Sequence, residues 1–249
     1  MKNLLLYVAI FVMGGTQARA ADVSVAVAAN FTAPMQKIAQ SFEQDSGHKV
    51  RMAFGATGNF YAQIKNGAPY QLLLAADDKT PLKLEQEGQG VIGSRFTYAV
   101  GKLVLWSMQP RLVDDQGGVL KTQNYQRLAI ANPKLAPYGA AAVEVLTNLG
   151  LLQAVQSKWV QGENIAQTYQ FVASENAQLG FVAMSQVMVE GKVTQGSVWV
   201  VPAQLYTPIR QDVVLLSVAK DDAPAKALLQ YLRSDKAKDI MRSFGYAMP

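Results

Sequence analysis

The feature that most constrains the fold is a regular alternation of apolar, β-prone segments with amphipathic helical segments, which runs along the chain twice. In the first series, buried strands are predicted at residues 22–30, 49–54 and 70–76. The segment after the first strand has one apolar helical face, formed by Phe31, Met35, Ile38 and Phe42. Strands that alternate with helices in this way indicate a mostly parallel sheet with helices on both faces.

The helices of the first series have recognisable starts. Thr32 and Thr80 are the predicted N-caps, because a threonine oxygen can accept a first-turn N–H and each is followed by a proline. Gly47 and Gly88 are predicted to end these two helices.

A second series of the same kind follows. Its strands are predicted at 127–132, 177–183 and 197–202. Its helices are predicted at 139–160 with a break near Gly150, at 163–174 and at 184–191, and the end of the chain is predicted to be helical over 222–244.

Two long β-rich segments, 94–107 and 207–219, separate these regions and are long enough to cross from one unit to another. The sequence therefore predicts a two-lobed α/β protein with two sheets joined by two hinge crossings. The first lobe is assigned 21–100 and 213–249, and the second lobe 101–212. Because ligands of open α/β sheets bind at the carboxyl ends of the strands, a ligand is expected in the cleft between the lobes.

The first twenty residues are predicted to be a secretory signal peptide. They contain a basic start at Lys2, about a dozen apolar residues, and the small-x-small sequence Ala18-Arg19-Ala20. The apolar stretch is too short to span a bilayer comfortably. We expect cleavage after Ala20 and export, most simply to a bacterial periplasm.

Composition excludes several classes of site. The chain has no Cys, so disulfides, thiol catalysis and Cys-metal sites are ruled out. Its single histidine, His48, argues against a His-metal cluster and a Ser-His-Asp triad. The net charge of +5 is spread along the sequence without a Lys/Arg block, so nucleic acid is not an expected partner.

Two strand-to-helix joints in the first lobe are polar but uncharged. The first ends in Asn30, and the second, "GATG", contains Thr57 between two glycines. Helix N-termini present unpaired N–H groups and a partial positive charge, so they can bind anions without a cationic side chain. Either joint alone is more simply explained as ordinary capping. Together they follow successive strands, which would place them side by side.

The second lobe offers two further joints. Tyr138 opens a helix after "NPKLAP", where its phenol is a hydrogen-bond donor, although it could equally well pack against the helix start. Ile165 lies in the first turn of another predicted helix, so its backbone N–H is expected to lack a helical partner.

The segments "AANF", "GATGNFYAQIKNGAPYQLLLAAD", "GSRFTYAVGKLVLW", "IANPKLAPYGAAA" and "LGFVA" resemble the periplasmic molybdate-binding proteins of bacterial ABC importers. The resemblance covers essentially the whole chain after the signal peptide. It implies the type II periplasmic-binding-protein fold, with one tetrahedral oxyanion, molybdate or tungstate, in the cleft. It also implies delivery to the permease of an ABC transporter, no cofactor, no enzymatic activity and a monomeric protein.

Carried over by position, the resemblance assigns the oxyanion to Ala29, Asn30, Thr57, Tyr138 and the backbone amide of Ile165, with Ala56 as a possible addition. The molybdenum would be held only through its oxygens by these residues. Many members of the family have Ser in the first loop and at the position of Thr57, and a Tyr where this chain has Ala183. Tyr138 is the expected replacement for that missing donor.

Neutral donors suit a fully deprotonated dianion. Charge-assisted hydrogen bonds offset the high cost of desolvating the ion. A site without acceptors also disfavours phosphate, which carries a proton near neutral pH. Between sulfate and the larger oxyanions only the size of the cavity decides, so the residues alone leave that choice open.

Two alternatives remain at this stage. One is a protein of the same fold for sulfate, thiosulfate, ferric iron or an organic acid; the last would need an arginine, and Arg95 and Arg210 lie near the crossings. The other is a periplasmic hydrolase, which would need paired carboxylates or a nucleophile with a base. Asp77 and Asp78 are adjacent and would point to opposite faces of an extended segment, so capping and solvated surface are the expected roles.

Overall fold

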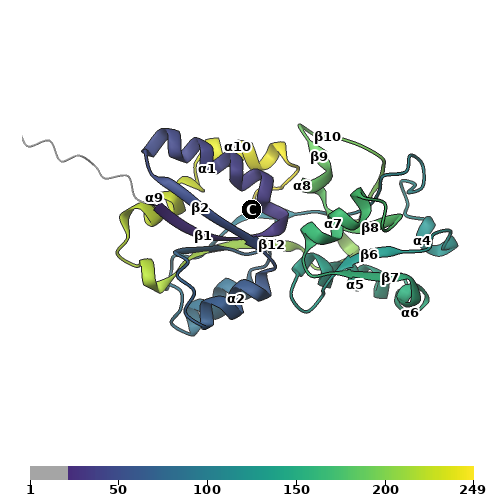
Figure 1. Ribbon diagram of the computed structural model, residues 1–249, viewed down its shortest axis with the longest axis horizontal. Helices are drawn as coiled ribbons and strands as arrows, with labels where there is room; N and C mark the ends of the chain where they lie inside the picture. The colour runs from purple at the N-terminus through teal and green to yellow at the C-terminus, as the bar shows by residue number, and fades with distance from the viewer. Residues whose placement is uncertain (1–21) are drawn as a thin grey trace, which may run out of the picture.

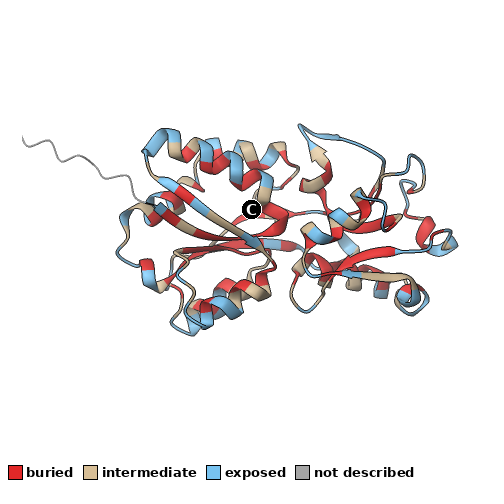
Figure 2. Cartoon of the chain, in the orientation of Figure 1, coloured by how far each residue is buried: buried red, intermediate tan, exposed pale blue. Residues whose placement is uncertain are grey.

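The computed structural model describes residues 22–249, and the predicted signal peptide at 1–20 lies outside the described residues. Figure 1 shows two lobes that lie side by side along the long axis of the molecule. Each lobe is built on a five-stranded sheet, and the inner faces of both sheets are buried (Figure 2). The prediction of two α/β sheets joined by two crossings is confirmed.

The sheet of the first lobe has the strand order β2-β1-β3-β12-β4. Its strands are β1 Asp22–Ala28, β2 Lys49–Gly55, β3 Leu72–Leu74, β4 Phe96–Gly101 and β12 Ile209–Leu215. β1 is parallel to β2 and β3, whereas β12 is antiparallel to β3 and β4. The first three strands therefore form the predicted parallel core, and the return of the chain adds the antiparallel edge.

Helices cover both faces of this sheet. One face carries η1 Ala29–Phe31, α1 Thr32–Ser46, η4 Ser217–Ala219, α9 Ala223–Tyr231 and α10 Asp235–Ser243, and the other carries α2 Thr57–Lys65 and α3 Lys79–Gln86. Alternate residues of β1 explain the two cores. Val23, Val25 and Val27 face α1, and the smaller Ala26 faces α2. Because both faces are covered, the strand is apolar at nearly every position.

The sheet of the second lobe has the order β11-β5-β8-β6-β7. Its strands are β5 Leu103–Ser107, β6 Leu128–Ala131, β7 Trp159–Gly162, β8 Leu179–Ala183 and β11 Ser197–Val200. The remaining elements of this lobe are α4 Val119–Thr122, α5 Pro137–Asn148, α6 Leu152–Val155, η2 Gln156–Lys158, α7 Ile165–Ala173, α8 Met184–Val187, β9 Met188–Val189, β10 Lys192–Val193 and η3 Ala203–Leu205. α5 packs on one face of the sheet and α7 on the other.

The two crossings are β4 to β5, which are separated by Lys102 alone, and the segment that leads from β11 into β12. β12 begins at Ile209, so the boundary drawn at residue 213 from the sequence falls inside this strand. The register of β12 against β4 shifts between Gln211 and Asp212, where β4 carries one extra residue, Tyr98.

Four local predictions were wrong. The helical segment predicted to run to residue 160 is wrong at its end, because residues 159–162 pair with β6 and form the edge strand β7. The helix expected over 184–191 stops after one turn. Thr32 does not cap α1: a 3-10 turn precedes the helix, and the Thr32 hydroxyl donates to the carbonyl of Ala29 at 2.8 Å. Thr80 does not cap α3 either, because Asp77 accepts its backbone N–H at 2.6 Å.

Within residues 22–249 no single helix is long and apolar enough to cross a membrane, although α5 and 152–158 pass that test as a pair bent by 118°.

Candidate anion-binding site

A small cavity lies between the lobes where strands end and helices begin. Its lining consists of Ala28, Ala29, Asn30, Gly55, Ala56, Thr57, Ala76, Ala136, Pro137, Tyr138, Asn164 and Ile165. The structure thus brings together all six residues that the sequence assigned to the oxyanion. Among the described residues, every side chain that lines this cavity is uncharged.

Four helix starts surround the cavity, two from each lobe. They are the starts of η1 leading into α1, of α2, of α5 and of α7. None of these four first turns contains an acidic residue. Converging N-termini place unpaired N–H groups and partial positive charge around one point, which favours an anion.

The cap of α7 leaves one backbone N–H at the helix start without a partner within the helix. The Asn164 side chain accepts the N–H groups of Ala166 at 2.9 Å and Gln167 at 3.0 Å. The amide of Ile165, the first residue of the helix, lies outside this cap. Its N–H is therefore a free first-turn donor at the cavity wall.

Thr57 is almost fully buried, so the groups around its hydroxyl determine which hydrogen bonds it can make. Its Oγ1 accepts the backbone N–H of Ala76 at 3.0 Å. Because that bond uses an oxygen lone pair, the hydroxyl proton remains for a partner in the cavity.

Tyr138 follows the same pattern in the second lobe. Its Oη accepts a hydrogen bond from Nε2 of Gln211 at 3.0 Å, and the side chain is 1% exposed. Burial raises the pKa of Tyr138 well above its usual value, so the phenol stays protonated and able to donate. Gly101 makes room for it, since a Cβ at that position would lie 2.0 Å from the Tyr138 oxygen.

Asn30 lies at the cavity, but its side chain is engaged within the protein. Nδ2 donates to Oε1 of Gln211 at 2.8 Å and to the hydroxyl of Tyr246 at 2.9 Å. Oδ1 is buried without a partner. The side-chain amide that the sequence suggested as a donor is therefore occupied in this arrangement, and the backbone N–H of Asn30 is the donor that remains.

Gln211, Tyr246 and Ser185 surround the site and were missed from the sequence. Ser185 donates to the carbonyl of Asn30 at 2.8 Å, and Tyr246 donates to the same carbonyl at 3.0 Å. In the sequence, the only indication of a role for Gln211 was its position as a polar residue beside the apolar part of a predicted crossing strand. Tyr246 follows the last helix, and nothing in its local sequence indicates that it folds back onto the first joint.

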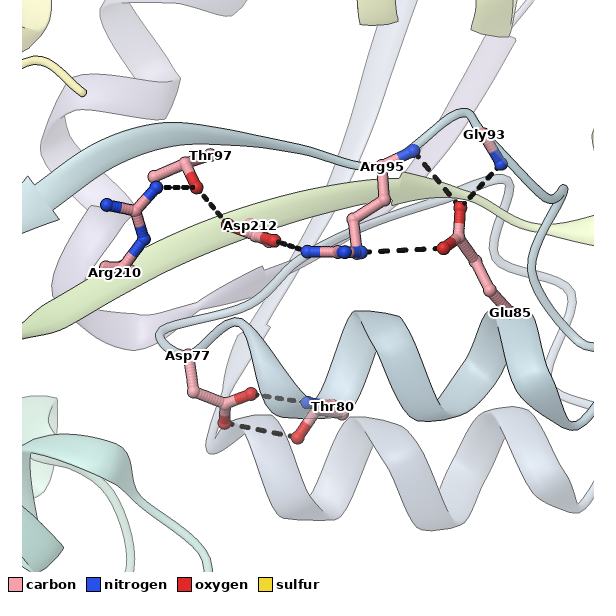
Figure 3. A network of polar contacts seen from close by, with 8 residues as sticks. All are labelled: Asp77, Thr80, Glu85, Gly93, Arg95, Thr97, Arg210 and Asp212. Atoms are coloured by element: carbon pink, nitrogen blue, oxygen red, sulfur yellow. Dashed lines mark hydrogen bonds and ion pairs between the residues drawn. The ribbon is translucent and has the colours of Figure 1, made fainter.

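The arginines considered from the sequence do not line the cavity. Arg95 is held by the buried carboxylate of Asp212 and by Glu85, whose oxygen lies 3.4 Å from Nε (Figure 3). Thr97 donates to Asp212 at 2.6 Å and accepts from Arg210 at 3.1 Å. Both arginines therefore belong to a network that braces β4 against β12.

Asp77 caps α3, as the sequence suggested, since it accepts both the N–H and the hydroxyl of Thr80 (Figure 3). Asp77 and Asp78 border a second, larger cavity of about 300 Å³, which also holds Lys79, Lys134 and Arg210. Ala183, at the position of the family tyrosine, ends β8 and does not line the anion cavity.

Comparisons with known proteins agree with this geometry. Residues 23–247 match the family model described as bacterial extracellular solute-binding protein. The molybdate-binding protein ModA of Azotobacter vinelandii is 62% identical over 231 residues, which span 93% of this chain and 92% of that protein. ModA of Rhodobacter capsulatus is 52% identical, spanning 92% and 89%.

A solved structure, the periplasmic molybdate-binding protein of Azotobacter vinelandii, superposes with a TM-score of 0.89 at 42% identity. It covers 91% of this chain and 99% of that one. With the uncharged cavity between two α/β lobes, these matches show that the chain belongs to the bacterial extracellular solute-binding proteins, within the family of the molybdate-binding proteins.

Proposed function

We propose that this protein binds molybdate in the periplasm and delivers it to the permease of an ABC importer. The observation that carries the proposal is the cavity itself, in which four helix starts and two hydroxyls meet and no charged side chain of residues 22–249 takes part. The high identity to proteins named as molybdate-binding supports the choice of ligand.

The donors of this cavity suit a dianion without protons. Thr57 and Tyr138 each accept a hydrogen bond from the protein, which occupies one lone pair and leaves the O–H proton to donate toward a ligand. Molybdate and tungstate share charge and tetrahedral shape, and we extend the proposal to tungstate on that ground. A protonated phosphate would need an acceptor, and the only unpaired side-chain acceptor among the described lining residues, Asn30 Oδ1, is buried within the protein.

Binding would favour the closed arrangement of the lobes. The lobes already meet through Gly58 N–H to the carbonyl of Leu135 at 2.9 Å and Asn59 Nδ2 to Glu163 Oε1 at 2.8 Å. An anion held by Thr57 from one side and Tyr138 from the other adds contacts that exist only when the lobes are closed. It therefore shifts the population toward the closed form, which the permease would recognise.

Calorimetric titration of the mature protein with molybdate, tungstate, sulfate and phosphate tests the proposal. We expect tight binding of molybdate and tungstate, weak binding of sulfate, and no binding of phosphate at neutral pH. Sulfate or thiosulfate bound more tightly than molybdate would support the alternative of a protein for another oxyanion.

A further inference from the structure

Gln211 lies in the hinge strand β12, directly before the shift in its register against β4, and is completely buried. A buried glutamine must satisfy both an acceptor and a donor group. It does so with side chains from both lobes, because Asn30 follows β1 in the first lobe and Tyr138 opens α5 in the second.

The hydrogen bonds of Gln211 form a chain in which each donor points the same way, from Asn30 to Gln211 and from Gln211 to Tyr138. Oε1 accepts from Asn30 Nδ2 at 2.8 Å and lies 3.0 Å from the hydroxyl of Tyr98, and Nε2 donates to Tyr138 Oη at 3.0 Å. In this direction Gln211 does not use the proton of Tyr138, which is available to a ligand in the cavity; the Tyr246 hydroxyl is the other group that interacts with it. Asn30 Oδ1 is left without a partner, although it is buried.

The opposite direction is also self-consistent. If the amides of Asn30 and Gln211 both turned by half a rotation, Tyr138 would donate to Gln211 Oε1, and Gln211 Nε2 would donate to Asn30 Oδ1. Nδ2 of Asn30 would then occupy the present position of Oδ1, and Tyr246 could donate to Oδ1. In either direction, one of the two side chains, Asn30 or Tyr138, keeps a donor that the other residues of this hydrogen-bond network do not use.

We propose that Gln211 is a positioning residue that fixes the direction of this hydrogen-bond chain, and with it whether the Tyr138 hydroxyl or the side-chain amide of Asn30 donates to the bound anion. The inference rests on the proposed function, because it takes molybdate as the anion. In the direction seen here, Gln211 makes Tyr138 the donor. It couples the hinge strand to the ligand without contacting the ligand itself.

A double-mutant cycle on molybdate affinity tests this role. Tyr138→Phe alone is expected to weaken binding about tenfold, the size of one hydrogen bond to a charged group. In the background of Gln211→Met, where nothing orients the phenol, the same change should weaken binding less than about threefold. Losses that multiply in the double variant would show that Gln211 acts only through packing, and would overturn the inference.

A matched control is Gln71→Met. Gln71 accepts the backbone N–H of Ser24 at 2.7 Å and does not line the cavity. This change should lower thermal stability and leave molybdate affinity unchanged. Wild-type titration in the same series separates the two claims. Absence of molybdate binding to the wild type overturns the proposed function and the inference, whereas binding with multiplicative losses overturns only the inference.

A second measurement on the wild type does not depend on the folding of Gln211→Met. When Tyr138 donates to an anion, its oxygen becomes a stronger acceptor. The side-chain amide proton of Gln211 should therefore move downfield in NMR spectra on saturation with molybdate, and this shift should disappear in Tyr138→Phe. An unchanged Gln211 amide signal in the saturated wild type would contradict the proposed chain.

Discussion

The hydroxyl of Thr57 accepts the backbone N–H of Ala76 at 3.0 Å, so its own proton is not needed for that bond and can be donated to a ligand. Tyr138 is arranged in the same way by Gln211 from the other lobe. In each hydroxyl a protein N–H occupies one acceptor lone pair and leaves the O–H proton unused, so the hydrogen bonds of the protein favour donation toward a ligand. We expect this arrangement of donors to favour the binding of a fully deprotonated oxyanion.

Thr57→Ala removes one of these donors. We expect molybdate affinity to fall about tenfold, because one charge-assisted hydrogen bond is lost. Thr57→Ser keeps the hydroxyl and should bind within about threefold of the wild type on the same grounds. Calorimetry measures both, and equal affinity of the alanine and serine variants would mean that the hydroxyl makes no contact.

Gly101→Ala is expected to create a steric clash at the hinge. The added Cβ would lie 2.0 Å from Tyr138 Oη and 2.6 Å from Gln211 Nε2, so both groups must move. We expect weaker molybdate binding in a protein that still folds.

Gly118→Ala is the control for this change. There the new Cβ would meet only the flexible carboxylate of Asp114 at 2.9 Å, outside the cavity. The prediction fails if both alanine variants bind molybdate like the wild type.

Arg95→Met tests the hinge network. Asp212 is fully buried and pairs with Arg95, so removal of the guanidinium leaves a buried carboxylate without its cation. We expect a loss of about 3 kcal/mol in the free energy of unfolding, measured with urea.

Arg51→Met is the matched surface control. Arg51 pairs with Asp22, and both side chains are exposed. Its loss should be below about 1 kcal/mol. Similar losses in the two variants would show that the burial of Asp212 has no energetic consequence.

Asp77→Asn should make stability less dependent on pH. Burial raises the pKa of the Asp77 carboxyl, and the charges of Asp78 and Asp212 act in the same direction. Between its unfolded and folded pKa values the folded state holds a proton that the unfolded state has lost, so wild-type stability falls as pH rises through this window.

The asparagine variant has no such loss. It should match the wild type at acid pH, below both pKa values, and exceed it increasingly as pH rises through the folded pKa. Denaturant unfolding across this range measures the difference, and a difference that is constant with pH would contradict the raised pKa.

The fold was largely predictable from the sequence because hydrophobic periodicity reports burial directly. The valines of β1 and the apolar face of α1 were identified in this way. The edge strand β7 was not, since Trp159 and Val160 extend an apolar helical pattern and only pairing with β6 makes them a strand. The caps predicted at Thr32 and Thr80 were wrong, because a 3-10 turn precedes α1 and Asp77 accepts the backbone N–H of Thr80 at the start of α3.

The uncharged joints at Asn30 and Thr57 pointed to the cavity, and the family resemblance assigned the full set of its proposed ligand residues. The residues behind them could not be found in this way. Gln211 and Tyr246 are 181 and 216 positions from Asn30, and no local pattern links residues so far apart. Arg95 and Arg210 remained open as ligands until the structure showed them bound to Asp212 and Thr97.

The central claim is that neutral donors at four helix starts hold molybdate between the lobes. X-ray diffraction from crystals of the molybdate complex, recorded at the molybdenum absorption edge, locates the metal directly. We expect one molybdenum within the cavity, with its oxygens at hydrogen-bond distance from Thr57 Oγ1, Tyr138 Oη and the amide of Ile165. Molybdenum located outside this cavity, or bound to an arginine or lysine side chain, would contradict the account.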